Sequence, residues 1–196
     1  AGVQQRLPIE TVDLDETAVV SIHNAGHEIG THGQDHIPWN ILIRRAKKQN
    51  AEASEEDRIA ELYQAQVAAP RATLERILEF PINLYRPPGG IGWKNASMPL
   101  PVQEYVTARG LNIAHWTDGR DSRDSLMVED KDAEVELAED GALATKRPKR
   151  QANSEEIAAV IKKAKDGDVI LVHSFGGKQG RWATVEALDE VIPELQ

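Results

Sequence analysis

The sequence predicts an α/β fold built on a parallel sheet, and two observations lead to this prediction. Segments with helical apolar spacing alternate along the chain with short apolar segments. Strands that are separated by helices form parallel sheets with right-handed crossovers, and reactive residues collect at the carboxyl ends of such strands. The polar residues at or just past predicted strand ends are His32, His36, Arg86, Asp118, Asp121 and His173.

Composition limits the classes of function that the chain can have. Its 196 residues are 40% apolar, which suits one sizeable domain with a buried core, and we predict a single domain over 1–196. No apolar run is long enough to span a membrane. A formal charge of −9 argues against binding to nucleic acid. Since the chain has no cysteine, a bound metal must be held by His, Asp or Glu.

Helical spacing and stop signals define the elements of the first half. A helix is predicted over 14–25, followed by a short strand over 27–31. Ser54 is predicted to cap a helix that Pro70 interrupts. The remaining predicted elements are a strand ending at 84–85, a helix over 101–109, a strand over 111–116, a helix over 153–165, a strand over 168–173 and a helix over 182–195.

Two histidines four residues apart, His32 and His36, follow the first predicted strand. In a tight loop at a strand end both imidazoles can face one divalent ion, and imidazole suits zinc and similar metals. This spacing alone is explained as well by surface or packing histidines. His23 and His27 are interpreted as a helix-face and a loop residue, and His115 as a residue of the core.

Three further groups of polar residues follow strands. The turn over 86–90, Arg-Pro-Pro-Gly-Gly, is stiff, and a guanidinium on it can orient a carboxylate by a bidentate contact, although an ordinary loop explains the residues as well. Asp118 and Asp121 either belong to the site or form an acidic surface turn. His173 ends a hydrophobic strand before a loop that contains glycine, which favours an imidazole that faces a pocket.

Together these motifs resemble those of the polysaccharide deacetylase family (the NodB-homology domain, carbohydrate esterase family 4). The similar segments are 26–36, with Gly-His-Glu-Ile-Gly before His-x-x-x-His, then 86–90, 116–121, 171–173 and the last helix at 183–188. Ser122 stands where the family usually has Trp. The family's first motif, Thr-Phe-Asp-Asp, which supplies a metal ligand and the catalytic base, has no match, and Asp13 and Asp15 are the nearest substitutes.

The resemblance implies a distorted (β/α) barrel of the polysaccharide deacetylase type that lacks its N-terminal strand–helix–strand portion. It implies a divalent metal, zinc or alternatively cobalt, held by His32 and His36. It further implies that His173 protonates the leaving group, that Arg86 orients the base, and that Asp121 or Asp118 holds His173 in its working tautomer. The side chains that would line a sugar-binding groove are Tyr85, Trp93 and Trp116.

The function implied by this resemblance is removal of acetyl groups from a polysaccharide such as peptidoglycan or chitin, outside the cell or in its envelope. Three explanations stay open for the unmatched motif: a companion N-terminal chain, an inactive remnant that binds glycans, or a substitute ligand from Asp13, Asp15 or Asp35. Metal-dependent hydrolysis of small cyclic amides is the alternative reaction.

Overall fold

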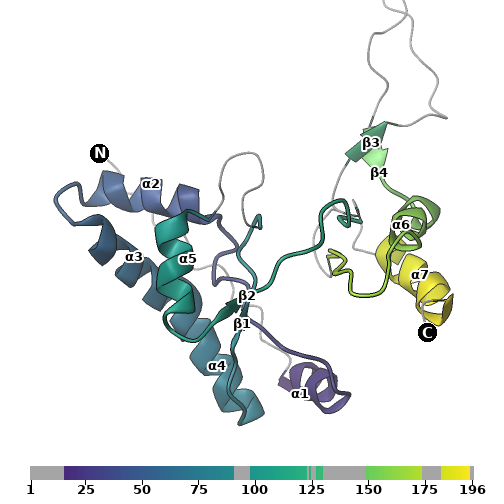
Figure 1. The fold of residues 1–196 in the computed structure, drawn as a ribbon, viewed down its shortest axis with the longest axis horizontal. Helices are drawn as coiled ribbons and strands as arrows, with labels where there is room; N and C mark the ends of the chain where they lie inside the picture. The colour runs from purple at the N-terminus through teal and green to yellow at the C-terminus, as the bar shows by residue number, and fades with distance from the viewer. Residues whose placement is uncertain are drawn as a thin grey trace, which may run out of the picture. The chain divides into compact units, whose positions relative to one another are not determined.

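The computed structural model describes residues 16–90, 98–122, 124, 127–129, 149–173 and 182–194. The chain divides into two compact units, Ala1–His115 and Trp116–Gln196 (Figure 1). The single domain expected over 1–196 therefore stays a prediction. No helix among the described residues is long and apolar enough to cross a membrane.

A small parallel sheet stands at the centre of the first unit. β1 (Leu84–Tyr85) pairs in parallel with β2 (Asn112–Ile113), and Thr31 forms a parallel bridge with Tyr85. Thr31 lies on the edge of β1 opposite to β2. Its N–H donates to the Leu84 carbonyl at 3.0 Å, and its carbonyl accepts the Arg86 N–H at 2.9 Å. The parallel arrangement confirms that the segments ending before His32 and Arg86 meet at one edge of the sheet.

Five α-helices and one π-helical turn are described in the first unit (Figure 1). They are α1 (Glu16–Asn24), α2 (Trp39–Gln49), α3 (Glu55–Tyr63), η1 (Gln64–Ala68), α4 (Ala69–Leu78) and α5 (Leu100–Thr107). The predicted cap is confirmed, because the Ser54 hydroxyl accepts a hydrogen bond from the Asp57 N–H at 3.0 Å. α2 was not predicted from the sequence, because its second half is strongly basic, although Trp39 and Leu42 are buried.

The interruption predicted at Pro70 is wrong. Figure 1 shows α3, η1 and α4 following one another along one helical rod, and their residues are contiguous. A proline inside an α-helix clashes with the carbonyl four residues earlier and offers it no N–H. The chain accommodates Pro70 with a wider turn, in which the Ala69 N–H donates to the Gln64 carbonyl five residues earlier.

The core of the first unit lies between the sheet and the helices α2, α3 and α5. Its buried residues are Trp39, Leu42, Ile59, Tyr63, Val67, Tyr85, Met98, Val102, Val106 and Leu111. Within it the Trp39 indole N–H donates to the Tyr85 hydroxyl at 2.8 Å. Burial raises the pKa of the Tyr85 phenol to about 12, although the Trp39 hydrogen bond acts in the opposite direction.

The second unit contains an isolated parallel β-bridge, an antiparallel strand pair and two α-helices among its described residues. Asp121 and Leu171 form a parallel bridge, in which the Ser122 N–H donates to the Leu171 carbonyl at 3.1 Å. The elements are β3 (Met127–Glu129), β4 (Lys149–Gln151), α6 (Ser154–Ile161), α7 (Trp182–Val191) and the 3₁₀ turn η2 (Ile192–Glu194). β3 and β4 pair antiparallel, and the sequence did not predict this pair.

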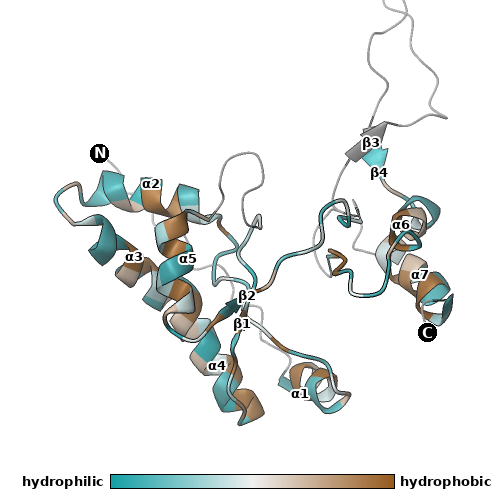
Figure 2. Cartoon of the chain, viewed as in Figure 1, coloured by the Kyte–Doolittle hydropathy of each residue, from teal (hydrophilic) through white to brown (hydrophobic). Residues whose placement is uncertain are grey.

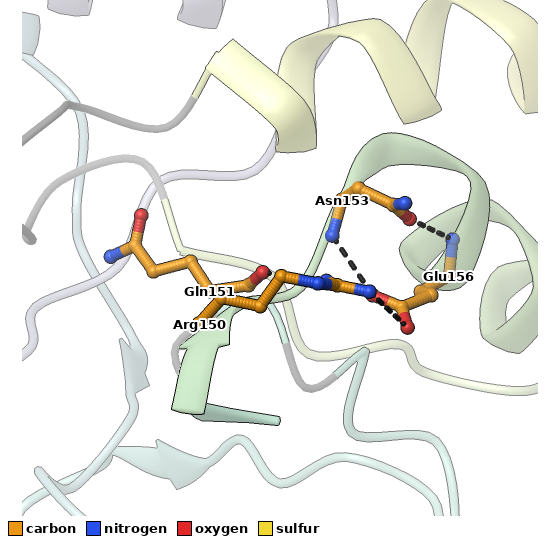
Figure 3. Close-up of polar contacts among 4 residues, drawn as sticks. All are labelled: Arg150, Gln151, Asn153 and Glu156. Carbon is orange, nitrogen blue, oxygen red and sulfur yellow. Dashed lines mark hydrogen bonds and ion pairs between the residues drawn. The ribbon is translucent and has the colours of Figure 1, made fainter. Parts of the chain in front are cut away.

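α6 and α7 pack together through an apolar cluster, and Figure 2 shows apolar positions recurring along both helices. Its buried residues are Ala152, Ile157, Ala158, Ile161, Ala187 and Val191. Figure 3 shows the junction at which β4 leads into α6. Asn153 and Glu156 form a reciprocal capping box, and both terminal nitrogens of Arg150 donate to the Glu156 carboxylate, at 2.8 and 3.0 Å. This helix ends earlier than predicted, at Ile161.

Candidate functional site

The first group of candidate residues follows the Thr31 strand end in the first unit. The ring of His32 approaches the Arg86 carbonyl, with 2.7 Å between Nδ1 and the oxygen. A carbonyl only accepts hydrogen bonds, so Nδ1 bears the proton and the lone pair lies on Nε2. Histidines that bind a metal through one ring nitrogen typically donate a hydrogen bond of this kind from the other ring nitrogen.

His36 lies beside His32 in the same loop. The two ring centroids are 4.8 Å apart, with an edge-to-face angle of 69°. His36 has a φ of 52°, which is unusual for a residue other than glycine. Gly33 has a φ of 82°, and a Cβ there would lie 3.1 Å from Cγ of Pro88. The histidine loop thus packs directly against the proline turn, and this contact requires glycine.

The donor set fits a divalent metal in part. His32 presents the nitrogen that metals bind, His36 lies next to it, and both side chains are exposed. Among the residues that the structure describes, no cluster of three or more His, Cys, Asp or Glu side chains is arranged to hold an ion. Asp13 and Asp15 lie outside the described residues. The pair therefore offers two imidazole ligands and would need further ligands from elsewhere.

Arg86 starts the proline turn next to these histidines. Its side chain is partly buried, and burial lowers the pKa of the guanidinium. Its main chain is engaged with Thr31 and His32. Within the described ranges the guanidinium contacts no carboxylate, and a half-buried cation is favoured by an anionic partner.

The second group lies in the second unit and is centred on His173. Nδ1 of His173 lies 2.8 Å from Oδ1 of Asp124, and the backbone N–H of His173 donates to Oδ2 at 2.7 Å. The Thr184 hydroxyl donates to the same Oδ2 at 3.1 Å. The Asp124 carboxylate is fully buried, whereas 30% of the His173 side chain is exposed.

These contacts determine the state of the pair. Burial acts to raise the pKa of Asp124, but the hydrogen bonds from His173 and Thr184 outweigh it, and the pKa lies below its ordinary value. An ionised carboxylate only accepts hydrogen bonds, so Nδ1 of His173 bears a proton. Nε2 is therefore the ring atom at which a proton can be gained or released.

The carboxylate that contacts the His173 ring is Asp124, so the prediction of Asp118 or Asp121 for this role is corrected. Asp118 lies exposed in a turn, and Asp121 uses its main chain to pair with Leu171. Asp121 pairs with Leu171 in a parallel bridge. A residue that follows Asp121 in the chain, and not Asp121 itself, therefore lies beside His173. The sequence offers one signal for Asp124, its position three residues after Asp121, but the register that gives this signal meaning is visible only in the structure.

The three aromatic residues predicted to contact sugar have different positions. Tyr85 is 1% exposed, and its hydroxyl accepts the Trp39 hydrogen bond. It is a core residue, and its prediction as a sugar contact is wrong. Trp116 is partly buried, and Trp93 lies outside the described residues, so both stay predictions.

Comparison with known proteins identifies the fold. A peptidoglycan N-acetylglucosamine deacetylase structure is 22% identical, with a TM-score of 0.57, and the match covers 91% of this chain and 61% of that one. A family 4 acetyl xylan esterase from Clostridium thermocellum, bound to a cobalt ion, is 20% identical over 93% of this chain and 64% of that one, with a TM-score of 0.57. A carbohydrate esterase family 4 pseudoenzyme from Bacillus anthracis is 16% identical over 92% and 45%, with a TM-score of 0.54.

The chain therefore has the (β/α) fold of the carbohydrate esterase family 4 polysaccharide deacetylases, as the motifs predicted. It spans 61% and 64% of the length of the first two of these structures. No protein-family model and no curated protein sequence matches the chain.

Proposed function

We propose that this chain is part of a metal-dependent hydrolase that removes acetyl groups from a polysaccharide, an N-acetylglucosamine polymer such as peptidoglycan or chitin. The observation that supports this most directly is the tautomer of His32, which is fixed by the Arg86 carbonyl with His36 alongside. The fold shared with a peptidoglycan deacetylase and an acetyl xylan esterase supports the substrate class. Such polymers lie outside the cytoplasm, and we propose the same location for this chain.

In this proposal His32 and His36 hold a divalent metal, zinc or cobalt. When bound, such an ion polarises the acetyl carbonyl as a Lewis acid. The role of the His32–Arg86 hydrogen bond is to place the lone pair of the neutral ring on Nε2 and to hold the ring in one orientation. Because Pro88 packs on Gly33, the proline turn supports the same loop from a second point.

His173 is the proposed general acid. Asp124 accepts the Nδ1 proton and grips the backbone N–H of the same residue, so the ring has one tautomer and one orientation. When the ring carries a second proton on Nε2, it delivers that proton to the departing amine nitrogen or alcohol oxygen and keeps the Nδ1 proton toward Asp124. Since the ring is 30% exposed and the carboxylate is fully buried, the substrate meets the imidazole and not Asp124.

The catalytic base and the remaining metal ligand are proposed to come from carboxylates outside the described residues, in this chain or in a companion chain. The half-buried guanidinium of Arg86 is suited to orient the base by a bidentate contact. A glycan-binding remnant is the second candidate function. Two observations favour it: the described residues hold no third ligand, and one structure of the same fold is a pseudoenzyme.

Acetate release from chitin oligomers and peptidoglycan tests the proposal. We expect release that chelation abolishes and that zinc or cobalt restores, and we expect His173→Ala to lose it while His23→Ala, which alters the helix face of α1, keeps it. Release that survives exhaustive chelation would refute the metal mechanism. Tight glycan binding without release, also after the companion segment is added, would favour the binding remnant.

A further inference from the structure

A buried glutamine, Gln66, contacts the loop between the two candidate metal ligands at three points. Its backbone carbonyl accepts the Gln34 N–H at 3.1 Å. Its side-chain Oε1 accepts the Asp35 N–H at 3.1 Å, and its Nε2 donates to Oδ2 of Asp35 at 2.7 Å. Gln66 is 6% exposed, whereas Gln34 and Asp35 are exposed, so these bonds are half-buried and tie a surface loop to the interior.

The sequence around Gln66 explains why its backbone is available to the loop. In an α-helix the carbonyl of Gln66 would accept the N–H four residues later, and that residue is Pro70, which has none. The π-helical turn η1 widens the helix at this place, with the Ala69 N–H bonded to the Gln64 carbonyl. Pro70 cannot donate the usual α-helical hydrogen bond to the Gln66 carbonyl. The Gln34 N–H donates to that carbonyl instead.

The contacts involve Gln34 and Asp35, which lie between His32 and His36. The conformation of these two residues determines the orientation of the His36 ring relative to the His32 ring. His36 has a φ of 52°, a conformation that needs support from its surroundings. Gln66 fixes both the backbone and the side chain of the preceding Asp35, and Pro88 packs on Gly33 from another direction. The loop is thereby held before any ion arrives, which lowers the ordering cost of binding.

We propose that Gln66 is a positioning residue for the metal-binding loop, and that Pro70 and its π-helical turn exist to present Gln66 to that loop. The inference rests on the proposed metal-binding role of His32 and His36. In this proposal the π-helical turn leaves the Gln66 carbonyl available to the loop. In a regular α-helix that carbonyl would be bonded within the helix.

The first test removes the clamp and measures the loop without metal. Gln66→Leu keeps a side chain of similar size and loses both side-chain bonds, so hydrogen exchange at the Gln34 and Asp35 amides should accelerate about tenfold or more. Gln64→Leu, an exposed position in the same turn, is the matched control and should exchange like the unmodified chain. Unchanged exchange at both amides in Gln66→Leu would overturn the inference.

The same contact can be removed by substituting Asp35, which is exposed. This second variant keeps the inference testable if Gln66→Leu fails to fold. Asp35→Ala removes only the bond from Nε2 of Gln66 to Oδ2, which Gln66→Leu also removes, so it should accelerate exchange less than Gln66→Leu, and combining the two should add little. Asp35→Asn keeps an oxygen that can accept from Nε2 and should restore slow exchange. Additive effects of the two substitutions would contradict a shared contact.

A third variant, Pro70→Ala, separates the clamp from helix stability. It returns an N–H to the Gln66 carbonyl, so the melting temperature should stay level or rise while exchange at the Gln34 amide accelerates. A Pro70→Ala chain with a lower melting temperature and unchanged exchange would contradict the role given to the π-helical turn.

Cobalt affinity, measured by competition with a chromophoric chelator, gives the consequence for the metal. Loss of an outer-shell partner typically weakens binding by about tenfold or more, and we expect this for Gln66→Leu and not for Gln64→Leu. Cobalt binding distinguishes a failure of the proposed function from a failure of the positioning role. If the unmodified chain binds no cobalt while the exchange results hold, the proposed function fails and the clamp stands. If cobalt binds and Gln66→Leu binds it equally well, the positioning role is wrong.

Discussion

Asp124→Asn is expected to change the tautomer of His173. From described residues the Asp124 carboxylate accepts two hydrogen bonds at Oδ2, from the His173 backbone N–H and Thr184, and one at Oδ1 from the His173 ring. Asparagine has one oxygen and one NH₂ group. The backbone N–H can only donate, so the oxygen must take the Oδ2 position and the NH₂ group must face Nδ1. Nδ1 then becomes the acceptor, and the ring proton moves to Nε2.

The magnitude follows from the same contacts. The substitution replaces charge-assisted bonds, each worth about 1.5–3 kcal/mol, by neutral ones worth about 1 kcal/mol, at a carboxylate that is fully buried. We therefore expect the free energy of unfolding to fall by roughly 1–3 kcal/mol. Because an NH₂ group facing Nδ1 no longer supports a proton there, the doubly protonated ring that donates from Nε2 is disfavoured, and acid catalysis should fall by about 10²–10⁴.

Nitrogen-15 imidazole spectra report the tautomer directly, and urea unfolding reports the stability. The unmodified chain should show protonated Nδ1 at His173 when the ring is neutral, and Asp124→Asn should show protonated Nε2. Thr184→Val, which removes only the neutral donor to Oδ2, is the control and should keep the Nδ1 tautomer. The reasoning is refuted if the unmodified chain already has the Nε2 tautomer, or if Asp124→Asn leaves the tautomer unchanged.

Four further outcomes follow from the described contacts. Since the folded pKa of Asp124 is lowered, its contribution to stability should be present above the unfolded pKa of about 4 and be lost as pH falls through the folded value in acid unfolding series. Gly33→Ala should reduce stability in urea more than Gly26→Ala, because both have positive φ but only the first Cβ meets Pro88. Tyr85 should ionise near pH 12 by ultraviolet absorbance, and about 3 kcal/mol of stability should be lost between pH 10 and pH 12, since its folded pKa is raised. Asn153→Ala should cost about 1 kcal/mol in urea unfolding by removing the cap of α6.

The sequence predicted the parts of the fold that local signals specify. Ser54 and Asn153 carry their capping partners three residues away, and both caps are present in the structure. The alternation of elements predicted the parallel pairing of Thr31, β1 and β2. Pro70 was misread, because a helix can absorb a proline when a wider turn and an outside donor compensate for the lost bond.

The candidate site was predictable where its residues lie in one motif and not where they depend on pairing. His32 and His36 stand in one short loop, so their spacing alone places their rings together. Asp124 reaches His173 because of the parallel bridge between Asp121 and Leu171, whose register a single sequence does not specify. Successive side chains along a strand such as β1 point to opposite faces of the sheet. Whether the face that carries Tyr85 borders the core or a groove depends on how the helices pack, which the sequence does not specify.

The central claim is that His32 and His36 bind a divalent metal in this fold. A cobalt(II) titration followed by visible absorption tests it most directly, with His23 and His27, a second pair at the same spacing, as the control. We predict one ion per chain, retained in His23→Ala and His27→Ala and lost in His32→Ala and in His36→Ala. Undiminished binding after His32 and His36 are both replaced, or binding that depends on His23 and His27, would contradict the account.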